Sequence, residues 1–445
     1  MLNRNGILAQ YHKQVLPNYG VFDEKRYFSA GQTACVVELK GIPIGISICE
    51  DLWDTGPASS VKAQGAQLLI NINASPYHMG KRLEREQLLR QRCREIQLPI
   101  IYCNLVGGQD ELVFDGESLV VDAAGQLCLT APAFEEHLTQ IQCHYHASAC
   151  EISPGTIYPA LSPVASIYQA LVLGMRDYIV KNGFKSALLG LSGGIDSALT
   201  AVLAVDALGA ANVEAVMLPS QYTSNMSLED AQRIATNLSI SYQEIPIQNL
   251  VNTFLTQLHP VLSQYATRQK DVTAENIQAR CRAVLLMALS NRSGKLLLTT
   301  GNKSEMAVGY ATLYGDMAGG FAPLKDVSKT LVYQLAAYRN TLNADIPQRV
   351  FERAPSAELA PGQTDQDTLP AYSLLDNIIT AYVENNQGEE DMVAAGLPRE
   401  TVQKVIKMIL AAEFKRRQSP PGLRITPRAF GRDWRYPISS GFGRG

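Results

Sequence analysis

Long apolar runs are missing from this sequence: none reaches the roughly 18 to 20 residues that a membrane-spanning helix needs. Its first residues, MLNRNGILAQYHKQ, also lack the apolar stretch and cleavage site of a signal peptide. Lys and Arg (39) do not exceed Asp and Glu (42), so there is no basic excess to suggest nucleic acid or an anionic membrane. These absences predict a cytoplasmic protein with small-molecule substrates and with no nucleic-acid or membrane partner.

Cysteine pairs of the CxxC type are also absent, although the chain has eight cysteines. Reduced thiols therefore fit the sequence better than a disulfide scaffold or a zinc ribbon. Cys143, His144, His146 and Cys150 lie close together, but adjacent Cys143 and His144 suit a strand edge better than the usual spacing of zinc ligands. We expect no metal at this cluster.

The composition that is present indicates a globular protein, with 46% hydrophobic and 18% charged residues. Its 445 residues suggest two or three domains. Three prolines and a glycine within residues 152–163 predict a linker, so we divide the chain into a first domain (1–150), a linker (151–163) and a second domain (164–445). In the first domain a charge-rich helix over 81–96 is expected to lie on a sheet with its basic side in solvent. The predicted strands of that domain are 33–39, 43–48, 67–72, 100–104 and 118–121.

In the second domain helices alternate with strands, which is typical of a Rossmann-like parallel sheet with helices on both faces. The predicted helices are 164–181, 197–208, 228–237 and 274–291, and the predicted strands are 186–191, 213–218, 242–247 and 295–299. The end of the chain, residues 420–445, is rich in Gly, Pro and Arg and is interpreted as an ordered tail or a lid. The overall fold class is therefore α/β.

The motif GLSGGIDS, residues 190–197, lies between a predicted strand and a predicted helix, at the carboxyl end of a parallel strand where ligands bind. Its glycines let backbone N–H groups turn inward, its serines add hydroxyls, and the helix N-terminus adds a positive dipole end, so the motif predicts a pyrophosphate site. Asp196 can hold magnesium there. The alternative is a plain Ser-Gly-Gly turn followed by an Asp-Ser helix cap. Neither a Walker motif nor GxGxxG is present.

The pattern S-G-G-x-D-S resembles the signature of PP-loop ATP pyrophosphatases, which cleave ATP to AMP and pyrophosphate. Further segments over 160–440 are similar to NAD synthetase, among them ENIQARCRAVLLMALSN (275–291), LLLTTGNKSEMAVGYATLYGD (296–316), PLKDVSKTLVYQLA (323–336), PSAELAPGQTDQDTLPAY (355–372) and AEFKRRQSPPGLRITPRAFGRDWRYPI (412–438). The resemblance implies that ATP and deamido-NAD are substrates and Mg²⁺ the cofactor. An acyl-adenylate would form first, and ammonia would then displace AMP to give NAD.

The same resemblance implies roles for individual residues. The ATP contacts would be Gly190, Leu191, Ser192, Gly193, Gly194, Ile195, Asp196, Ser197 and Thr300. The magnesium ligands would be Asp196 and Glu305, and the deamido-NAD contacts Asn276, Glu305 and Lys415. Arg280 and Lys325 are candidate anion partners, although Arg280 is also explained as a helix-surface arginine. Glu305 is also explained as a charge that stabilises a helix N-terminus.

Three segments of the first domain resemble the nitrilase-like glutaminase domain of glutamine-dependent NAD synthetases: YHKQVLPNYGVFDEKRYF (11–28), IGISICEDLW (44–53) and NASPYHMGKRLEREQLLR (73–90). The resemblance implies an αββα sandwich with Cys49 as nucleophile and Lys13 as catalytic lysine and oxyanion partner. It implies glutamine contacts at Tyr19, Ser75 and Lys81. From its position alone, Cys49 at the end of an apolar strand is also explained as a buried core thiol.

One departure from the family concerns its catalytic glutamate, which lies on a strand well before the lysine, whereas no glutamate here precedes Glu24. We expect an incomplete amidase domain that lacks the family's first strands and helix, with Glu24 not acting as the base and glutamine a poor ammonia donor. The resemblance also implies an internal ammonia tunnel and a homo-oligomer. The alternatives are another PP-loop amidotransferase, a tRNA thiolase, for which the single Cys281 of the second domain is too few, and a non-catalytic assembly protein.

Overall fold

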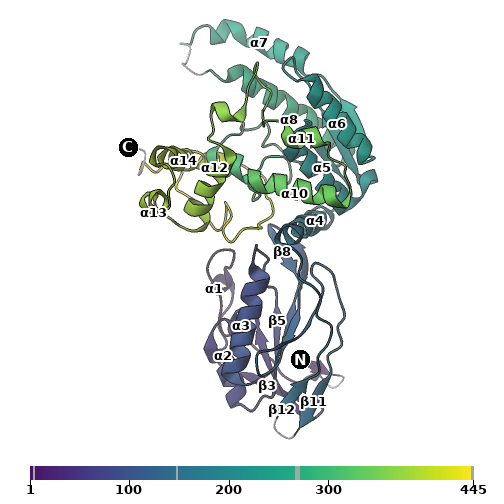
Figure 1. Ribbon diagram of the computed structural model, residues 1–445, viewed down its shortest axis with the longest axis vertical. Coiled ribbons are helices and arrows are strands. Elements are labelled where there is room, and N and C mark those ends of the chain that lie inside the picture. The colour runs from purple at the N-terminus through teal and green to yellow at the C-terminus, as the bar shows by residue number, and fades with distance from the viewer. Residues whose placement is uncertain (4–5, 147–148, 266–270, 442–445) are drawn as a thin grey trace. The chain divides into compact units, whose positions relative to one another are not determined.

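The computed structural model describes residues 1–3, 6–146, 149–265 and 271–441. Its contacts divide the chain into two compact units, which Figure 1 shows as ribbons. The first unit comprises Met1–Gly107 and Leu112–Ala170, and the second comprises Gly108–Glu111 and Leu171–Gly445. No helix among the described residues is long and apolar enough to span a membrane.

The first unit is built on a six-stranded sheet with the order β10-β9-β6-β5-β4-β3. The three central strands β4, β5 and β6 run parallel, and the outer pairs are antiparallel. All five predicted strands are confirmed, with ends that differ by at most two residues. The six strands are β3 (Cys35–Leu39), β4 (Ile42–Ile48), β5 (Leu68–Asn73), β6 (Ile100–Asn104), β9 (Leu119–Val121) and β10 (Leu127–Thr130).

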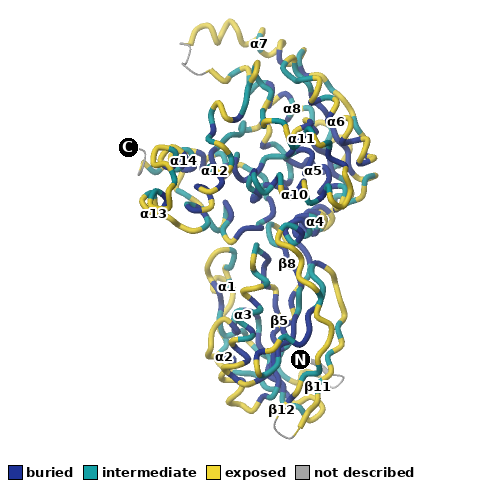
Figure 2. The backbone as a smooth tube through the Cα atoms, viewed as in Figure 1, coloured by how far each residue is buried: buried dark blue, intermediate teal, exposed yellow. Residues whose placement is uncertain are grey.

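Two helices, α2 (Thr55–Ala63) and α3 (Lys81–Ile96), supply apolar side chains to a core shared with this sheet, and the backbone in Figure 2 is accordingly buried there. Helix α3 has the predicted ends. Its basic side is not all in solvent, however: Arg85 is 1% exposed and Arg92 3%. That expectation was wrong because each guanidinium has buried partners, Asp115 for Arg85 and the carbonyl oxygen of Leu52 for Arg92.

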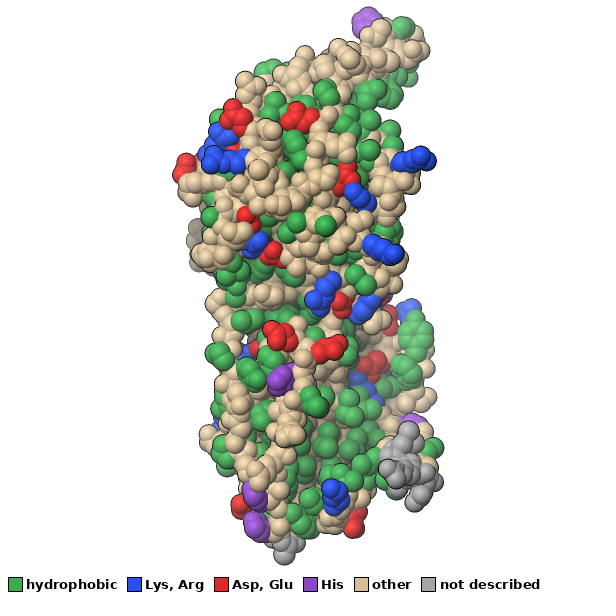
Figure 3. Space-filling view, turned by 90° about the vertical axis from the view of Figure 1, so that its right-hand side faces the viewer, with side chains coloured by type: hydrophobic (Ala, Val, Ile, Leu, Met, Phe, Trp, Pro, Cys, Tyr) green, Lys and Arg blue, Asp and Glu red, His purple; other side chains and the backbone are tan. Residues whose placement is uncertain are grey.

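A second apolar cluster of the first unit includes Val37, Ile44, Leu68 and Cys150, so it joins the sheet to a hairpin. This hairpin pairs β11 (Cys143–His146) with β12 (Ala149–Ile152), which confirms a strand at the Cys/His cluster. Figure 3 shows hydrophobic side chains gathered on the surface of the first unit. The shorter elements of this part of the chain are β1 (Leu2–Asn3), β2 (Gly6–Ile7), α1 (Glu24–Tyr27), η1 (Cys49–Leu52), β7 (Val106–Gln109) and β8 (Leu112–Asp115).

The second unit contains a four-stranded parallel sheet with the order β15-β14-β13-β16, which confirms the predicted class of fold. Its strands are β13 (Ala187–Gly190), β14 (Val213–Met217), β15 (Ser241–Glu244) and β16 (Leu296–Leu298). The predicted alternation is present, and a helix that the sequence analysis did not predict, α7, follows β15. The helices up to β16 are α4 (Pro163–Lys181), α5 (Ile195–Leu208), α6 (Asn225–Asn237), α7 (Gln248–Leu262) and α8 (Thr273–Ser293), with the short turn η2 (Ala210–Asn212).

After β16 the chain forms further helices around a second apolar cluster, to which Leu375, Met392, Val405 and Ile409 belong. These elements are α9 (Lys303–Val308), α10 (Lys329–Leu342), α11 (Gln348–Glu352), η3 (Asp365–Asp367), α12 (Tyr372–Ile379), η4 (Thr380–Glu384), α13 (Glu389–Ala394), α14 (Arg399–Ala411) and α15 (Glu413–Arg416). The described part of the tail is tied to this region, because the backbone N–H groups of Ile425 and Thr426 donate to Asp326 at 2.8 and 2.7 Å.

Candidate active site

The GLSGGIDS loop connects the end of β13 to the start of α5. Gly193 has φ +80°, and a Cβ there would lie 2.4 Å from the carbonyl oxygen of Ser227, so this position requires glycine. The loop is held internally, since Ser197 Oγ donates to the carbonyl of Gly194 at 2.9 Å and accepts from the backbone N–H of Ser192 at 3.2 Å. These hydrogen bonds fix the backbone at the start of α5, where a helix N-terminus favours an anion.

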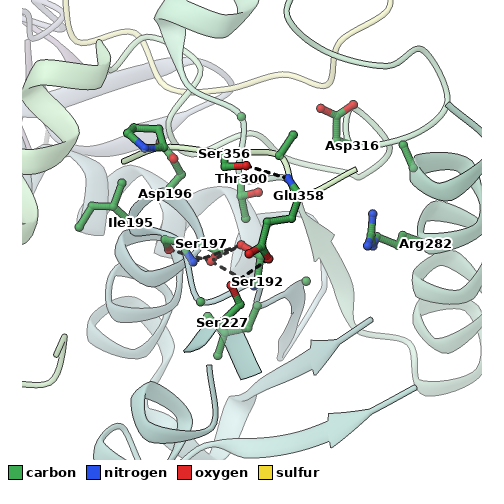
Figure 4. Close-up of a pocket in the computed structure, with 18 of the residues that line it drawn as sticks. Ser192, Ile195, Asp196, Ser197, Ser227, Arg282, Thr300, Asp316, Ser356 and Glu358 are labelled. Carbon is green, nitrogen blue, oxygen red and sulfur yellow. Dashed lines mark hydrogen bonds between the residues drawn. The ribbon is translucent and has the colours of Figure 1, made fainter. Parts of the chain in front are cut away.

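A cavity of about 310 Å³ opens at this loop (Figure 4). All eight motif residues and Thr300 line it, together with the end of β14, part of α8 and the segment 353–359. The structure thus brings every predicted ATP contact to one cavity. Such a place, at the carboxyl ends of parallel strands, is where ligands bind in sheets of this kind.

Two acidic side chains, Asp196 at the start of α5 and Glu305 in α9, meet at the side of this cavity. Asn302 connects them: its Nδ2 donates to Asp196 Oδ1 at 2.8 Å and its Oδ1 accepts from the backbone N–H of Glu305 at 3.0 Å. Lys329 lies on the other side, hydrogen-bonded to Asp196 Oδ2 and 3.5 Å from Glu305 Oε1. Both predicted magnesium ligands are therefore hydrogen-bonded to Asn302, and both lie beside the ammonium group of Lys329.

Burial and the neighbouring charge of Asp196 raise the pKa of Glu305 to about 8. Burial opposes the charge of Lys329, but Asp196 and Glu305 outweigh it and raise the pKa of that ammonium. Glu305 also caps α9, since its Oε2 accepts from the backbone N–H of Asn302 at 3.3 Å, so the predicted helix-terminus role is present as well. A cation reduces the electrostatic repulsion between two neighbouring carboxylates.

Mg²⁺ suits such a pair, because it prefers oxygen ligands and is usually held by one or two carboxylates, with waters and phosphate oxygens completing the octahedron. Among the described residues no group of three or more His, Cys, Asp or Glu side chains is placed to hold a metal. The pair Asp196 and Glu305 fits a metal that arrives with a nucleotide better than a permanent protein-enclosed ion.

Of the three residues predicted to contact deamido-NAD, Glu305 lines the cavity, while Asn276 and Lys415 lie beside the segment 309–313. Asn276 Oδ1 accepts from the hydroxyl of Thr312 at 3.0 Å. Lys415 Nζ donates to the carbonyls of residues 309 and 311, both at 2.7 Å, and burial lowers its pKa.

The two candidate anion partners are bound to backbone as well. Arg280 Nε donates to the carbonyl of Leu313 at 3.2 Å, on an exposed part of α8. Lys325 Nζ donates to the carbonyl of Pro420 at 2.8 Å and lies 3.8 Å from Glu111. Neither residue lines the main cavity.

Six charged residues that the sequence does not single out also line the cavity: Arg282, Asp316, Lys329, Arg353, Glu358 and Asp365. Arg353 donates to Ser227 Oγ at 2.5 Å and forms an ion pair with Glu358, whose Oε2 accepts from the same hydroxyl at 2.8 Å. This pair fastens the segment 353–359 to α6. Local periodicity does not distinguish a buried charge from a surface one. The only sequence signal for this ion pair is that Glu358 lies in the segment 355–372 that resembles NAD synthetase.

In the first unit Cys49 directly follows β4 and begins η1, with φ +45°, a conformation that is uncommon outside glycine. The residue is 9% exposed. Burial raises the pKa of its thiol, against the opposing charge of Lys13. Lys13 itself is paired with Glu24, whose two carboxylate oxygens accept from Nζ at 2.7 Å. The charge of Lys13 therefore acts on the Cys49 thiol and favours its thiolate.

The three predicted glutamine contacts differ in exposure. Tyr19 is exposed and its hydroxyl donates to Glu50 of η1 at 2.6 Å. Lys81 Nζ lies 4.1 Å from the ring centre of Trp53. Ser75 is 3% exposed, and its Oγ accepts from Arg85 Nε at 3.1 Å. Tyr19 therefore contacts the residue after Cys49, and Lys81 contacts Trp53 four positions after it, whereas Ser75 belongs to a buried polar network.

Comparison with known proteins finds a family match for each half of the chain. The NAD synthase family model matches residues 167–419, and the carbon-nitrogen hydrolase model matches residues 1–148. The glutamine-dependent NAD(+) synthetase of Acinetobacter baylyi is 47% identical over 439 residues, which cover 98% of this chain and 80% of that protein. The one from Aquifex aeolicus is 45% identical over 99% of this chain and 83% of its own length.

A solved structure, the glutamine-dependent NAD+ synthetase of Acinetobacter baumannii in complex with ADP, superposes with a TM-score of 0.75 at 44% identity. That match covers 99% of this chain and 83% of the solved one. High identity along almost the whole chain, with both family models in the same order, makes the chain a member of the glutamine-dependent NAD(+) synthetase family.

Proposed function

We propose that the chain makes NAD by ATP-dependent amidation of deamido-NAD, releasing AMP and pyrophosphate. The observation that carries this proposal is one cavity that holds the whole GLSGGIDS loop, Thr300 and the pair Asp196 and Glu305. A pyrophosphate-binding loop beside two carboxylates serves attack on the α-phosphorus, because it holds the departing pyrophosphate while charge develops on it.

The chemistry needs two steps because a carboxylate does not react with ammonia directly. A carboxylate oxygen of deamido-NAD attacks the α-phosphorus, and the bond to the β-phosphate oxygen breaks. Ammonia then attacks the acyl carbon, loses a proton, and AMP leaves. The backbone N–H groups at Gly193 and Gly194 and the hydroxyl of Thr300 would bind and orient phosphate oxygens. Asp196 and Glu305 would hold Mg²⁺, which when bound neutralises charge on the phosphates.

The test is an assay of all products with deamido-NAD, ATP, magnesium and ammonium. We expect NAD, AMP and pyrophosphate in equal amounts. Formation of ADP and phosphate, or pyrophosphate release that deamido-NAD does not stimulate, would contradict the proposal. ATP without deamido-NAD is the control.

The source of ammonia is the second part of the proposal: glutamine would be hydrolysed at Cys49, with Lys13 stabilising the oxyanion. Because burial raises the pKa of Cys49, its thiol is mostly protonated at neutral pH, and the attacking thiolate is scarce. We therefore expect ammonium to support faster turnover than glutamine. The measurement compares the two donors, with Cys49→Ala as control. Equal rates that depend on Cys49 would contradict this expectation.

A homo-oligomer is the third part. Helix α7 supports it, because Leu250, Phe254, Leu258 and Val261 follow one another at helical spacing and are 36–52% exposed. Phe254→Glu should shift the chain toward monomer in light scattering. An unchanged mass would exclude this face from the interface. We also propose a cytoplasmic location, as expected from the sequence.

A further inference from the structure

Lys329, the first residue of α10, is a buried cation at the edge of the nucleotide cavity. It is 2% exposed, and its ammonium contacts both Asp196 and Glu305, whose side chains are each 18% exposed. A lysine is almost never buried this far unless it is paired. Two carboxyl groups and one ammonium group thus form one cluster.

The hydrogen bonds of this cluster divide the four carboxylate oxygens equally. Asn302 contacts Asp196 Oδ1 at 2.8 Å and Glu305 Oε2 at 3.3 Å. Lys329 takes the other two, Asp196 Oδ2 and, at 3.5 Å, Glu305 Oε1. A metal ion held by both carboxylates either takes an oxygen that now faces Lys329 or, if it takes the oxygens that face Asn302, is held on the same carboxylates as the ammonium of Lys329. Since two cations repel each other, Lys329 and the metal compete.

We propose that Lys329 is the counter-cation of the metal-free site: it holds Asp196 and Glu305 together, and a divalent metal must displace its ammonium from at least one of them. The proposal rests on the proposed function only in taking these carboxylates as the metal ligands. Displacement frees the ammonium for a phosphate oxygen of the arriving nucleotide. The protein would then bind metal weakly alone and well with nucleotide, because only the nucleotide offers Lys329 a new anionic partner.

The experiment measures Mn²⁺ binding to the full chain by the loss of the free Mn²⁺ signal in electron paramagnetic resonance, without nucleotide or deamido-NAD. We compare the wild type with Lys329→Met and with Lys329→Gln, which keeps a polar group of similar length. Both variants should bind Mn²⁺ at least about tenfold more tightly than the wild type, a coupling of ordinary size between two sites. Asp196→Asn added to either variant should abolish the gain.

Lys303→Met is the matched control, because Lys303 is 1% exposed and is likewise paired with two carboxylates, Asp326 and Glu384, away from the cavity. It should produce no tightening that depends on Asp196. A Kd for Mn²⁺ that is unchanged or weaker in both Lys329 variants would overturn the proposal. A gain that survives Asp196→Asn would also overturn it, because the metal would then lie elsewhere.

Thermal unfolding separates this role from simple packing. The Lys329 variants should melt below the wild type in EDTA and recover most of that difference when Mn²⁺ is added, because the metal replaces the missing cation. An equal deficit with and without Mn²⁺ would mean that Lys329 is only structural. Since no catalytic turnover is measured, the outcome is independent of which carboxylate substrate the enzyme amidates.

Discussion

Replacement of Arg85 by methionine tests the buried polar network that holds Ser75 in the first unit. Arg85 Nη1 donates to both oxygens of Asp115, at 2.7 and 2.8 Å, and both side chains are 1% exposed. Its Nε donates to Ser75 Oγ at 3.1 Å and its Nη2 to the carbonyl of Ser75 at 2.8 Å. Arg85→Met keeps most of the volume and removes these four hydrogen bonds and a fifth, from Nη2 to the carbonyl of Pro76 at 3.3 Å.

The expected loss of stability comes from the carboxylate of Asp115, which stays buried when Arg85 is removed. A buried carboxylate left without its partner typically costs about 3–5 kcal/mol. Asn104 Nδ2, which donates to Asp115 at 3.3 Å, offsets only a small part. We therefore expect Arg85→Met to lower the free energy of unfolding by about 4 kcal/mol at pH 7. Replacing both partners, as in Arg85→Met with Asp115→Leu, should cost clearly less, about 1–2 kcal/mol, because no unpaired charge remains.

The assay is urea unfolding followed by fluorescence. The chain has two tryptophans, Trp53 in the first unit and Trp434 in the second, so Trp434→Phe leaves a probe of the first unit alone. A loss below about 1 kcal/mol for Arg85→Met, or a double variant less stable than the single one, would refute the account of the pair. As a functional readout, Arg85→Met should raise the KM for glutamine more than that for ammonium, because Ser75 loses its support.

Three further predictions concern charge. Asp196→Asn should lower kcat in the NAD assay by about 10² to 10³-fold. It should also lower the circular-dichroism melting temperature, because the buried ammonium of Lys329 loses a charged partner. Unchanged turnover would remove Asp196 from the mechanism. Burial, then Asp115, raises the pKa of Glu117 to about 7; the folded state therefore binds this proton more tightly than the unfolded state, and stability is lost as pH rises from about 4.3 to about 7. Glu117→Gln should gain about 1–3 kcal/mol over the wild type between pH 4 and pH 8 in melting experiments, and a constant difference would contradict this. Iodoacetamide should alkylate Cys49 slowly at pH 7 and faster at higher pH, and Lys13→Met should slow it at every pH, as peptide mass spectrometry would show.

The sequence predicted those elements of the fold that depend on residues only a few positions apart. The ends of the helix over 81–96 and the turn of the GLSGGIDS loop depend on residues within a few positions, and both have the expected place. The strands β4, β5 and β6 are short apolar runs between turn residues, and each was predicted to within a residue or two. Periodicity reports which face is apolar, and in these elements the apolar face is buried.

Contacts between residues far apart in the sequence could not be predicted from such local patterns. Lys329 reaches Asp196 across 133 positions, and Arg85 reaches Asp115 across 30. By composition alone a lysine or an arginine is a surface residue, and only a tertiary partner makes its burial favourable. The same reason explains the error over the basic side of α3. The missing signal is therefore the identity of the partner, which a single sequence does not contain.

The hydrogen bonds of Asn276 and Lys415, which the family resemblance assigns to deamido-NAD, indicate a second role for these residues. Lys415 uses two of its three ammonium donors on the carbonyls of residues 309 and 311, and Asn276 is bound to Thr312. Arg280 holds the next carbonyl, that of Leu313. All three thus form hydrogen bonds with one short segment, 309–313, which follows α9 and its Glu305. A substrate that contacts this segment would be positioned by the same residues that fix its backbone, so substituting any of them should alter the geometry of Glu305 as well as the contacts of the substrate.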